Sequence, residues 1–289
     1  IKQELIDAKY NVIDSPIVVG PKDFDVPQLR DRAIIVAVRK DIYNKPIKFD
    51  VPRKKANTTS IYNILDNNLS ANEKKEYKIS NREENVLNCW NDFINKIKFV
   101  PIQKKDSNGN KVYDRKNFEG VIGFPIWAFE FGDDYDLDDP KLDYPDWKKE
   151  FIRKNRKLYD SWLKKWNNLS DFSHTEKKFE WQCGPKFKSV WDGIIQFRPS
   201  GIRVKQPTES PTLVAMVHVP IIGRYKRYLT IKETARLQSF PEDYDFSNES
   251  KFNAYKQLGN AVNVDVIYNV FKLFVNYIET ETTEIVKEK

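Results

Sequence analysis

A run of six apolar residues near the start of the chain, AIIVAV at 33–38, sets the first requirement on the fold. Small and branched apolar side chains without polar alternation are typical of a strand that is covered on both faces. We therefore predict a buried strand here, preceded within residues 1–45 by a short helix and a loop. A single strand cannot form a sheet, so this run needs partners from elsewhere in the chain.

The most regular region of the sequence lies near the other end, at residues 229–279. Thr230-Ile-Lys-Glu233 has the capping-box pattern, which predicts a helix that runs to about Ser239, before Pro241. A second helix is predicted after Gly259-Asn260, because apolar residues recur there at helical spacing. The residues of this stripe are Val262, Val266, Ile267, Val270, Phe271, Phe274, Val275 and Ile278.

Between these regions, from about 46 to 195, the sequence is polar and irregular, with Asn and Lys clusters and an SNGN turn at 107–110. This composition predicts an inserted, irregular domain. One helix is predicted inside it, because Trp147, Phe151, Leu158, Trp162 and Trp166 recur at helical spacing. Basic residues, Lys148 among them, are expected on its remaining surface, either solvated or lying along phosphate. The acidic segment before this helix, FEFGDDYDLDDPKLDYPD, lacks the mid-loop Gly and the terminal Glu of a calcium loop and is expected to be solvated.

The composition favours a folded, soluble protein, with 40% hydrophobic and 31% charged residues. A formal net charge of +7 and a pI near 9.0 favour a polyanionic partner such as nucleic acid. Cys89 and Cys183 lie far apart and outside any CxxC spacing, so a disulfide scaffold and a zinc site are not indicated. No apolar run approaches the roughly 20 residues that span a bilayer, and we expect a cytoplasmic protein.

The residues that lead into the apolar run form a candidate binding row. In an extended chain, side chains two apart share a face, so Gln28, Arg30 and Arg32 would project together. Two guanidinium groups and an amide suit the binding of a phosphate or a base carbonyl. A structural row of salt bridges fits the same pattern, and both readings stay open at this point.

Three segments, in the required order, resemble motifs of the DNA (cytosine-5) methyltransferases. VPQLRDRAIIVAVRKD (26–41) resembles the Q-x-R-x-R motif, YLTIKETARLQSFPEDY (228–244) the next motif, and YKQLGNAVNVDV (255–266) the last. In that family the variable target-recognition domain lies between the first two, where this chain is irregular. RPSGIRVK (198–205) and SPTLVAM (210–216) are also similar to segments of bacterial members, and Thr212-Leu213 resembles a short motif that meets the DNA backbone.

The resemblance implies a reaction and a set of roles. Methylation at C5 requires the cytosine to be flipped out of the duplex, attacked at C6 by a thiolate, and stabilised as charge develops. Arg32 would contact the flipped cytosine, while Arg30 and Gln28 would hold the pocket and the phosphate. Asn260 and Ala261 would bind S-adenosylmethionine, because they are expected at a helix start, where free N–H groups favour a carboxylate. The expected contacts to double-stranded DNA are Arg198, Arg203, Thr212 and Leu213.

The expected fold class is α/β, with a partial methyltransferase domain of Rossmann-like type built from the two chain ends. An irregular mixed α+β target-recognition domain would complete it. Residues 1–48 would supply the last strands of the catalytic domain, and 49–227 the recognition domain. Residues 228–289 would supply a helix that braces the recognition domain and a C-terminal helix that returns to the catalytic domain.

The family's nucleophile is a Cys that follows Pro, and neither LNCWN around Cys89 nor WQCGP around Cys183 has that pattern. The Gly-rich cofactor loop and the Glu-Asn-Val segment are not found either. We therefore expect a fragment or a split-enzyme subunit of a restriction-modification system that needs an N-terminal catalytic half. Without that half, the strand and the C-terminal stripe would expose apolar surface. The alternative is a stand-alone, sequence-specific DNA-binding module with no catalytic partner.

Overall fold

The computed structural model describes residues 1–53, 59–97, 102–105, 111–114, 126–184, 187–213 and 218–287. The SNGN turn predicted at 107–110 and residues 214–216 of the SPTLVAM segment lie outside these ranges. The chain is a mixed α/β protein with a mixed sheet, as expected. It divides into two compact units: unit 1 comprises Ile1–Leu65, Thr212–Val217 and Ile231–Lys289, and unit 2 comprises Asp66–Pro211 and His218–Thr230.

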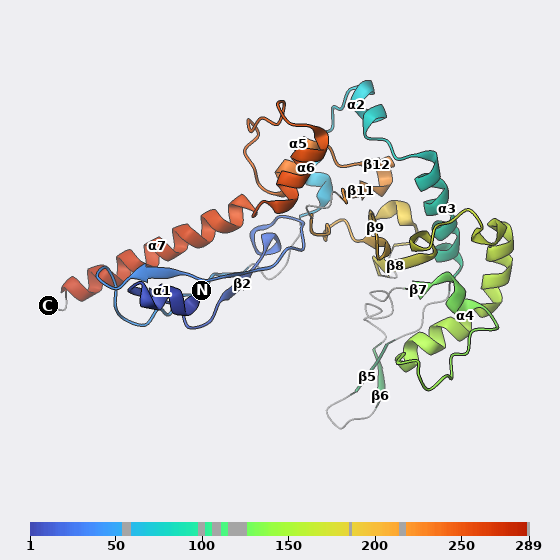
Figure 1. Cartoon of the computed structure of the whole chain (residues 1–289), viewed down its shortest axis with the longest axis horizontal. Helices are drawn as coiled ribbons and strands as arrows, with labels where there is room; N and C mark the ends of the chain where they lie inside the picture. The colour runs from blue at the N-terminus through green and yellow to red at the C-terminus, as the bar shows by residue number, and fades with distance from the viewer. Residues whose placement is uncertain are drawn as a thin grey trace. The chain divides into compact units, whose positions relative to one another are not determined.

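Unit 1 contains both ends of the chain (Figure 1). Its helices are α1 (Lys2–Asp7), α5 (Ile231–Leu237), α6 (Lys251–Asn260) and α7 (Val264–Lys287). Its strands form two antiparallel pairs, β1 (Tyr10–Val12) with β4 (Ala37–Arg39) and β2 (Ile17–Val19) with β3 (Arg32–Ile34).

The core of unit 1 forms between the N-terminal region and α7, which run side by side in Figure 1. One face of α7 is buried against apolar residues between Ile13 and Val51. The contributing residues of α7 are Val266, Val270, Phe274 and Ile278. The ring of Phe274 packs edge-on against that of Phe49, with 5.2 Å between centroids. The first fifty residues and the last helix therefore stabilise each other.

The predicted buried strand at 33–38 is wrong. The chain forms two short strands there, because β3 pairs with β2 whereas β4 pairs with β1. Ile35, between them, is 37% exposed, although Val36 is buried. A small antiparallel sheet commonly packs one face against the core and leaves the other face in water. An apolar run alone therefore does not show that a strand is buried on both faces.

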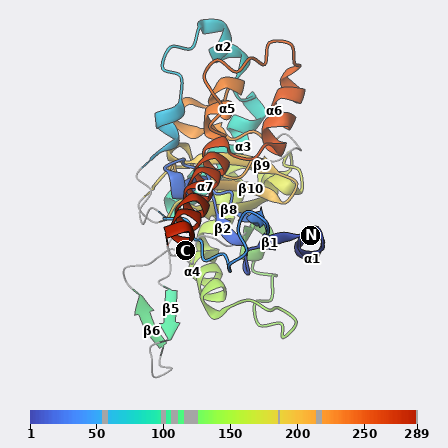
Figure 2. The ribbon, with the colours of Figure 1, turned by 90° about the vertical axis from the view of Figure 1, so that its left-hand side faces the viewer.

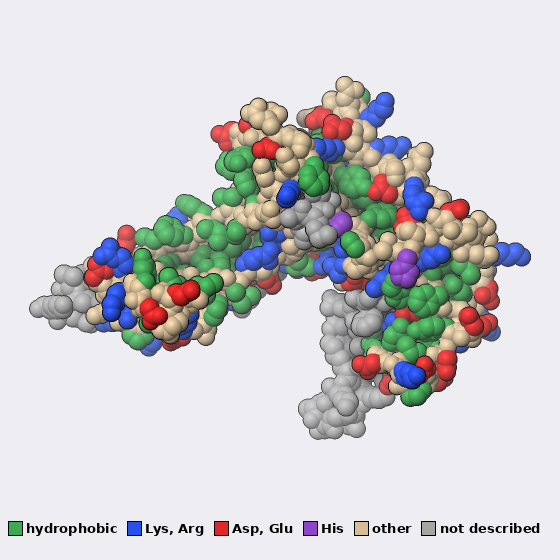
Figure 3. All heavy atoms as spheres, viewed as in Figure 1, with side chains coloured by type: hydrophobic (Ala, Val, Ile, Leu, Met, Phe, Trp, Pro, Cys, Tyr) green, Lys and Arg blue, Asp and Glu red, His purple; other side chains and the backbone are tan. Residues whose placement is uncertain are grey.

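The apolar stripe predicted at 262–278 is only half correct. Val266, Val270 and their neighbours one turn apart are buried, but Ile267 is 43% exposed and Phe271 67% exposed. Successive residues of a helix are turned by about 100°, so these two lie on a second face. Figure 3 shows hydrophobic side chains gathered along α7. Val262 lies before the helix begins and is also exposed.

Unit 2 is built on a six-stranded mixed sheet of order β12-β11-β9-β10-β8-β7. The pair β10–β8 is parallel and the other pairs are antiparallel. The strands are β7 (Ile126–Trp127), β8 (Lys178–Gln182), β9 (Ile194–Arg198), β10 (Gly201–Lys205), β11 (Ile221–Ile222) and β12 (Arg227–Tyr228). A separate antiparallel pair, visible in Figure 2, consists of β5 (Ile102–Lys105) and β6 (Lys111–Asp114). The helices are α2 (Ala71–Glu76), α3 (Asn81–Lys96) and α4 (Asp146–Lys165).

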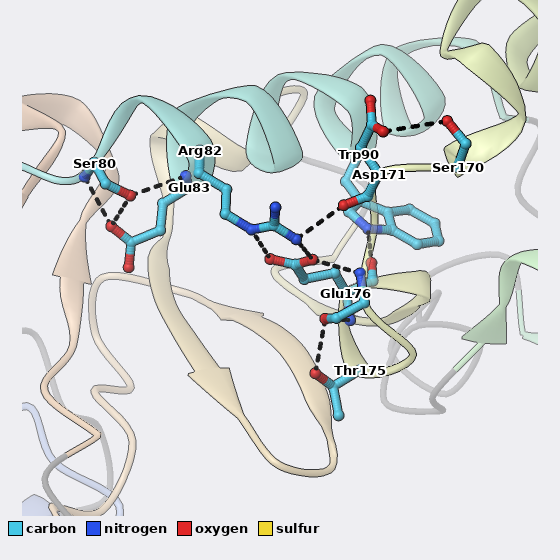
Figure 4. Close-up of polar contacts among 9 residues, drawn as sticks. Ser80, Arg82, Glu83, Trp90, Ser170, Asp171, Thr175 and Glu176 are labelled. Atoms are coloured by element: carbon cyan, nitrogen blue, oxygen red, sulfur yellow. Dashed lines mark hydrogen bonds and ion pairs between the residues drawn. The ribbon is translucent and has the colours of Figure 1, made fainter.

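Hydrogen bonds and an ion pair between Ser80 and Trp90 hold helix α3 in place (Figure 4). Ser80 caps it, because Glu83 N donates to Ser80 Oγ at 3.2 Å and Ser80 N donates to Glu83 Oε2 at 2.8 Å. Arg82 binds the carboxylate of Glu176 with two nitrogens, at 2.7 and 3.1 Å. Trp90 donates its indole N–H to the carbonyl of Glu176 at 2.8 Å. The central apolar face of α3 is thereby fixed in the core of unit 2.

Helix α4 confirms the predicted amphipathic helix but corrects the position of one cation. Lys148, expected on the charged surface, is buried, and its Nζ lies 2.9 Å from Glu130 Oε1. Glu130 belongs to the acidic segment that we expected to be solvated, yet it is fully buried. Tyr144 OH donates to the same carboxylate at 2.6 Å. Because Lys148 and Glu130 are buried together, neither charge is left unpaired. The helical period of α4 gives no information about such a partner.

Helix α5 begins at Ile231, next to the predicted cap, and ends at Leu237. Ser239 lies two residues beyond, in the left-handed region with φ 56°, so the helix stops slightly earlier than expected. Within the described ranges, no helix is both long and apolar enough to cross a membrane.

The two faces of α7 make a direct prediction about stability. Phe274→Ala should lower the free energy of unfolding by about 3 kcal/mol, because it opens a cavity beside Phe49. Phe271→Ala removes the same side chain from an exposed position and should change it by less than about 0.5 kcal/mol. Urea denaturation followed by circular dichroism measures both. Equal losses for the two variants would contradict the assignment of the faces.

Candidate functional site

One buried side chain, Arg30, connects three separate segments of unit 1. Its Nη2 donates to the carbonyl oxygens of Gly259 and Ala261, each at 2.9 Å. Its Nη1 donates to the carbonyl oxygen of Leu213. Segments that are 183 and 231 residues away in sequence therefore meet at one guanidinium.

An arginine suits this position because its planar group carries several donors in a fixed fork. Gly259 and Asn260 are the last residues of α6, where helical carbonyls are unpaired and a positive charge is favourable. Burial, and secondly the charge of Arg32, lower the pKa of Arg30 from its usual value. The hydrogen bonds to three carbonyls offset part of that cost. Arg30 therefore links its own segment to the backbone of Leu213, Gly259 and Ala261. We call this set of hydrogen bonds the Arg30 tie.

Gln28, Arg30 and Arg32 do not form one row of donors. Gln28 is fully buried, and neither its amide oxygen nor its amide nitrogen has a hydrogen-bond partner among the described residues. Arg32, the first residue of β3, is exposed and donates to the carbonyl of Asp31 at 2.8 Å. Gln28 and Arg30 are thus buried, whereas Arg32, in strand β3, is exposed.

Thr212 and Leu213 contact the segment that contains Arg30. Thr212 donates its hydroxyl to the carbonyl of Leu29. Leu213 is buried, and its carbonyl is one of the three acceptors of Arg30. Thr212 is thus held through its side-chain hydroxyl, and Leu213 through its backbone carbonyl.

Asn260 and Ala261 do not lie at a helix start, and that expectation is corrected. They lie at the C-terminal end of α6, and the Ala261 N–H is already donated to Gln257 O at 2.9 Å. Helix α7 begins later, at Val264, where Asn263 Oδ1 accepts from Val266 N at 3.1 Å. The backbone at 259–261 therefore presents carbonyls, which repel a carboxylate. The side chain of Asn260 is exposed.

In unit 2, Arg198 and Arg203 share one carboxylate. Arg198 Nη2 lies 2.6 Å and Arg203 Nε 2.9 Å from Glu180 Oε2. Glu180 is 6% exposed, and Gln182 Nε2 donates to its other oxygen. Burial, and secondly the charge of Arg203, lower the pKa of Arg198, while Glu180 acts in the opposite direction. The sequence analysis identified Arg198 and Arg203 as candidates but not Glu180, because only the register of the strands brings Glu180 between the two arginines.

Both cysteine side chains are buried in the core of unit 2. Cys89 and Cys183 are free thiols with 0% and 1% exposure. Burial raises the pKa of both thiols well above the usual value, and the charges of Asp92 near Cys89 and of Asp192 and Glu209 near Cys183 raise it further. The reactive form of a thiol is the thiolate, so both groups are chemically inert in the fold. Within the described residues, no group of three or more His, Cys, Asp or Glu side chains can hold a metal ion.

A family model described as C-5 cytosine-specific DNA methylase matches residues 1–276. The type II methyltransferase M.AluI of Cellulosimicrobium cellulans is 34% identical over 194 residues, 63% of this chain and 36% of that protein. M.BanI of Aneurinibacillus aneurinilyticus is 47% identical over 104 residues, 36% of this chain and 22% of that protein. The chain thus spans about a third of the length of M.AluI, and less of M.BanI. A solved structure of S. pombe Dnmt2 methyltransferase aligns with a TM-score of 0.40 at 14% identity, covering 96% of this chain and 61% of that chain.

Arg30 and Arg32 make a matched pair of substitutions. Arg30→Ala should lower the free energy of unfolding by about 3 kcal/mol, because buried carbonyls lose a charged donor. Arg32→Ala should change it by less than about 0.5 kcal/mol, since its side chain is exposed. Chemical denaturation distinguishes the two. A neutral effect of Arg30→Ala would show that the tie does not hold unit 1 together.

Thiol reactivity tests the burial of the cysteines. Near pH 8, where an ordinary thiol is about a quarter ionised, a chromogenic disulfide reagent should leave the folded chain unmodified. After unfolding in guanidinium chloride, both thiols should react at once. Rapid reaction of either thiol in the folded chain would contradict the inert state of these groups.

Proposed function

We propose that this chain, which belongs to the C-5 cytosine-specific DNA methylase family, is the part that recognises double-stranded DNA and presents a flipped cytosine for methylation. The observation that carries the proposal is the tie made by Arg30. It joins three of the segments that resemble family motifs or recognition segments, those around 28–32, 212–213 and 259–261. Such a meeting point is expected if these segments border one base pocket. A restriction-modification role follows from the type II methyltransferases among the relatives.

The proposed roles follow the burial of each side chain. Arg32 is exposed and free to leave the carbonyl of Asp31, so we assign it to the flipped cytosine. Arg30 supports the pocket from behind, because both of its terminal nitrogens donate to backbone carbonyls. Gln28 is assigned to the pocket as well, since its buried amide has no partner among the described residues. Such a group costs free energy unless a ligand or another segment pairs with it.

Residues of both units are assigned to contacts with DNA. Thr212 and Leu213 in unit 1 would meet the sugar-phosphate backbone, and Arg198 and Arg203 in unit 2 would bind DNA. Unit 2, with its irregular connections, would be the target-recognition domain. Unit 1 would be the methyltransferase side, formed from the two chain ends.

The methyl donor would be S-adenosylmethionine, which supplies an electrophilic methyl group when bound. The fit to residues 259–261 is partial, because two of their carbonyls accept from Arg30 and the Ala261 N–H is used within the helix. The exposed amide of Asn260 is the group that we assign to the donor. One amide cannot hold a molecule of this size, so residues other than 259–261 would supply most of the cofactor site.

The nucleophile is also assigned to another polypeptide region, in the same gene or in a separate subunit. Attack on C6 of cytosine requires a thiolate, and the two thiols of this chain are buried and neutral. We therefore propose that residues 1–289 do not transfer a methyl group by themselves.

A complementation experiment tests this division of labour. The chain is mixed with a protein that carries a cofactor loop and a Pro-Cys nucleophile from the same family, together with duplex DNA and tritiated S-adenosylmethionine. Methyl transfer that requires both proteins supports the proposal. Methyl transfer by the chain alone contradicts it, and sequence-specific DNA binding with no productive partner favours a stand-alone recognition module.

Arg32→Ala separates base-pocket from backbone roles in the reconstituted enzyme. The substitution should reduce methyl transfer by at least about 100-fold, because charge on the flipped cytosine loses its guanidinium. Duplex binding, measured by fluorescence anisotropy, should stay within about threefold of the wild type. Equal losses of transfer and binding would instead make Arg32 a backbone anchor.

A further inference from the structure

The central sheet of unit 2 has one apolar and one charged face. Phe179 of β8 lies opposite Ile202 of β10, and Ile202 lies opposite Phe197 of β9. Side chains alternate along a strand, so the residues between them point to the other side. On that side, Glu180 lies opposite Arg203, and Arg203 lies opposite Gln196. The charged residues that the alternation places on this face are Lys178, Glu180, Arg198, Arg203 and Lys205.

Glu180 is the only acid among those five residues, and it lies between two of the cations. Its Oε2 accepts from Arg198 at 2.6 Å and from Arg203 at 2.9 Å, and its Oε1 accepts from Gln182. These contacts use one nitrogen of each guanidinium. Arg198 Nε is buried and has no hydrogen-bond partner in the described part of the chain. The carboxylate therefore fixes both guanidinium groups, while the side chains of Arg198 and Arg203 stay 17% and 28% exposed, so part of each remains open to a further acceptor.

The charges of this cluster do not cancel. Two guanidinium groups around one carboxylate leave a net positive charge, and Lys178 lies on the same face. Holding two cations together in a half-buried place is unfavourable unless an anion offsets their repulsion. Glu180 offsets part of it, and a second anion would offset the rest. The arrangement suits a ligand that carries negative charge.

The width of the sheet indicates which part of DNA this ligand is. Strands lie about 4.8 Å apart, so six strands extend over about 24 Å. The major groove of DNA is only about 12 Å wide. Arg198 and Arg203 lie on β9 and β10, which are interior strands, so their face cannot enter the groove to reach base edges. It can lie against the sugar-phosphate backbone.

We propose that Glu180 is a positioning residue that holds Arg198 and Arg203 as a two-guanidinium site for a backbone phosphate of duplex DNA. This inference rests on the proposed function, because it requires that the chain bind duplex DNA. Glu180 itself does not touch the DNA. It orients the two guanidinium groups, although its own negative charge by itself disfavours the binding of a phosphate.

The sign of one substitution separates positioning from simple charge. Glu180→Gln removes a negative charge and raises the formal net charge of +7 by one, which by charge alone should tighten DNA binding. If Glu180 positions the arginines, the same change weakens binding. Glu150→Gln makes the identical change of charge at an exposed position of α4 and is the matched control.

The probe is a fluorescent 30-base-pair duplex of mixed sequence, titrated with the full chain at several KCl concentrations. Glu180→Gln should weaken binding at least about fivefold and make the dependence of log K on log salt shallower by about 1, because a phosphate contact is lost. Glu150→Gln should stay within about twofold of the wild type. Binding by Glu180→Gln that equals or exceeds that of Glu150→Gln overturns the inference. A wild-type chain that does not bind the duplex overturns the proposed function, and the inference with it.

Two further measurements keep the outcome clear. The titration is repeated with a scrambled duplex, and a loss confined to one of the two sequences would make the arginines base readers and overturn the phosphate assignment. If circular dichroism shows that Glu180→Gln is unfolded, Arg203→Lys replaces it. That variant keeps the charge but loses the planar fork, and should bind both duplexes at least about threefold more weakly. Wild-type affinity of Arg203→Lys would show that charge alone is sufficient.

Discussion

The arrangement of unit 1 depends on the buried guanidinium of Arg30, which donates hydrogen bonds to three backbone carbonyls. Arg30 collects carbonyl oxygens from a loop and from the corner between α6 and α7, so it fixes where the strand entry, the 212–213 segment and the last helix meet. A lysine would bring the charge but not the planar fork, and a neutral side chain would leave the end of α6 without a cation. The positions of the neighbouring functional candidates follow from this one contact.

Local signals in the sequence predicted helices well. The period of α4, the cap before α5 and the period of α7 are all properties of neighbouring residues, although α7 begins at Val264, later than expected. The predictions that were wrong depended on distant partners. The apolar run at 33–38 divides because two different strands pair with its halves, and Lys148 is buried because Glu130 is buried with it. Periodicity within one segment cannot contain that information.

The candidate site shows the same division. The sequence identified Arg30, Thr212 and the 259–261 segment, but the geometry that joins them is a long-range set of hydrogen bonds. Gly259 was read as the start of the next helix, whereas it lies near the end of the previous one, and this reverses the electrostatics from donors to acceptors. In unit 2, alternation along KFEWQ and GIRVK separates the faces of the sheet correctly. Only the register of β8 with β10 brings Glu180 beside Arg203.

The shared core of the chain ends has a consequence for the order of folding during synthesis. Almost all of unit 2 is one continuous stretch, and it is complete once residue 230 has left the ribosome. The apolar residues of 13–51 must wait for α7, more than two hundred residues later, before they are covered. Contacts of such long sequence separation form slowly, and exposed apolar segments are prone to aggregate in the meantime. The nascent N-terminal region is therefore the part of this chain that most needs protection by chaperones.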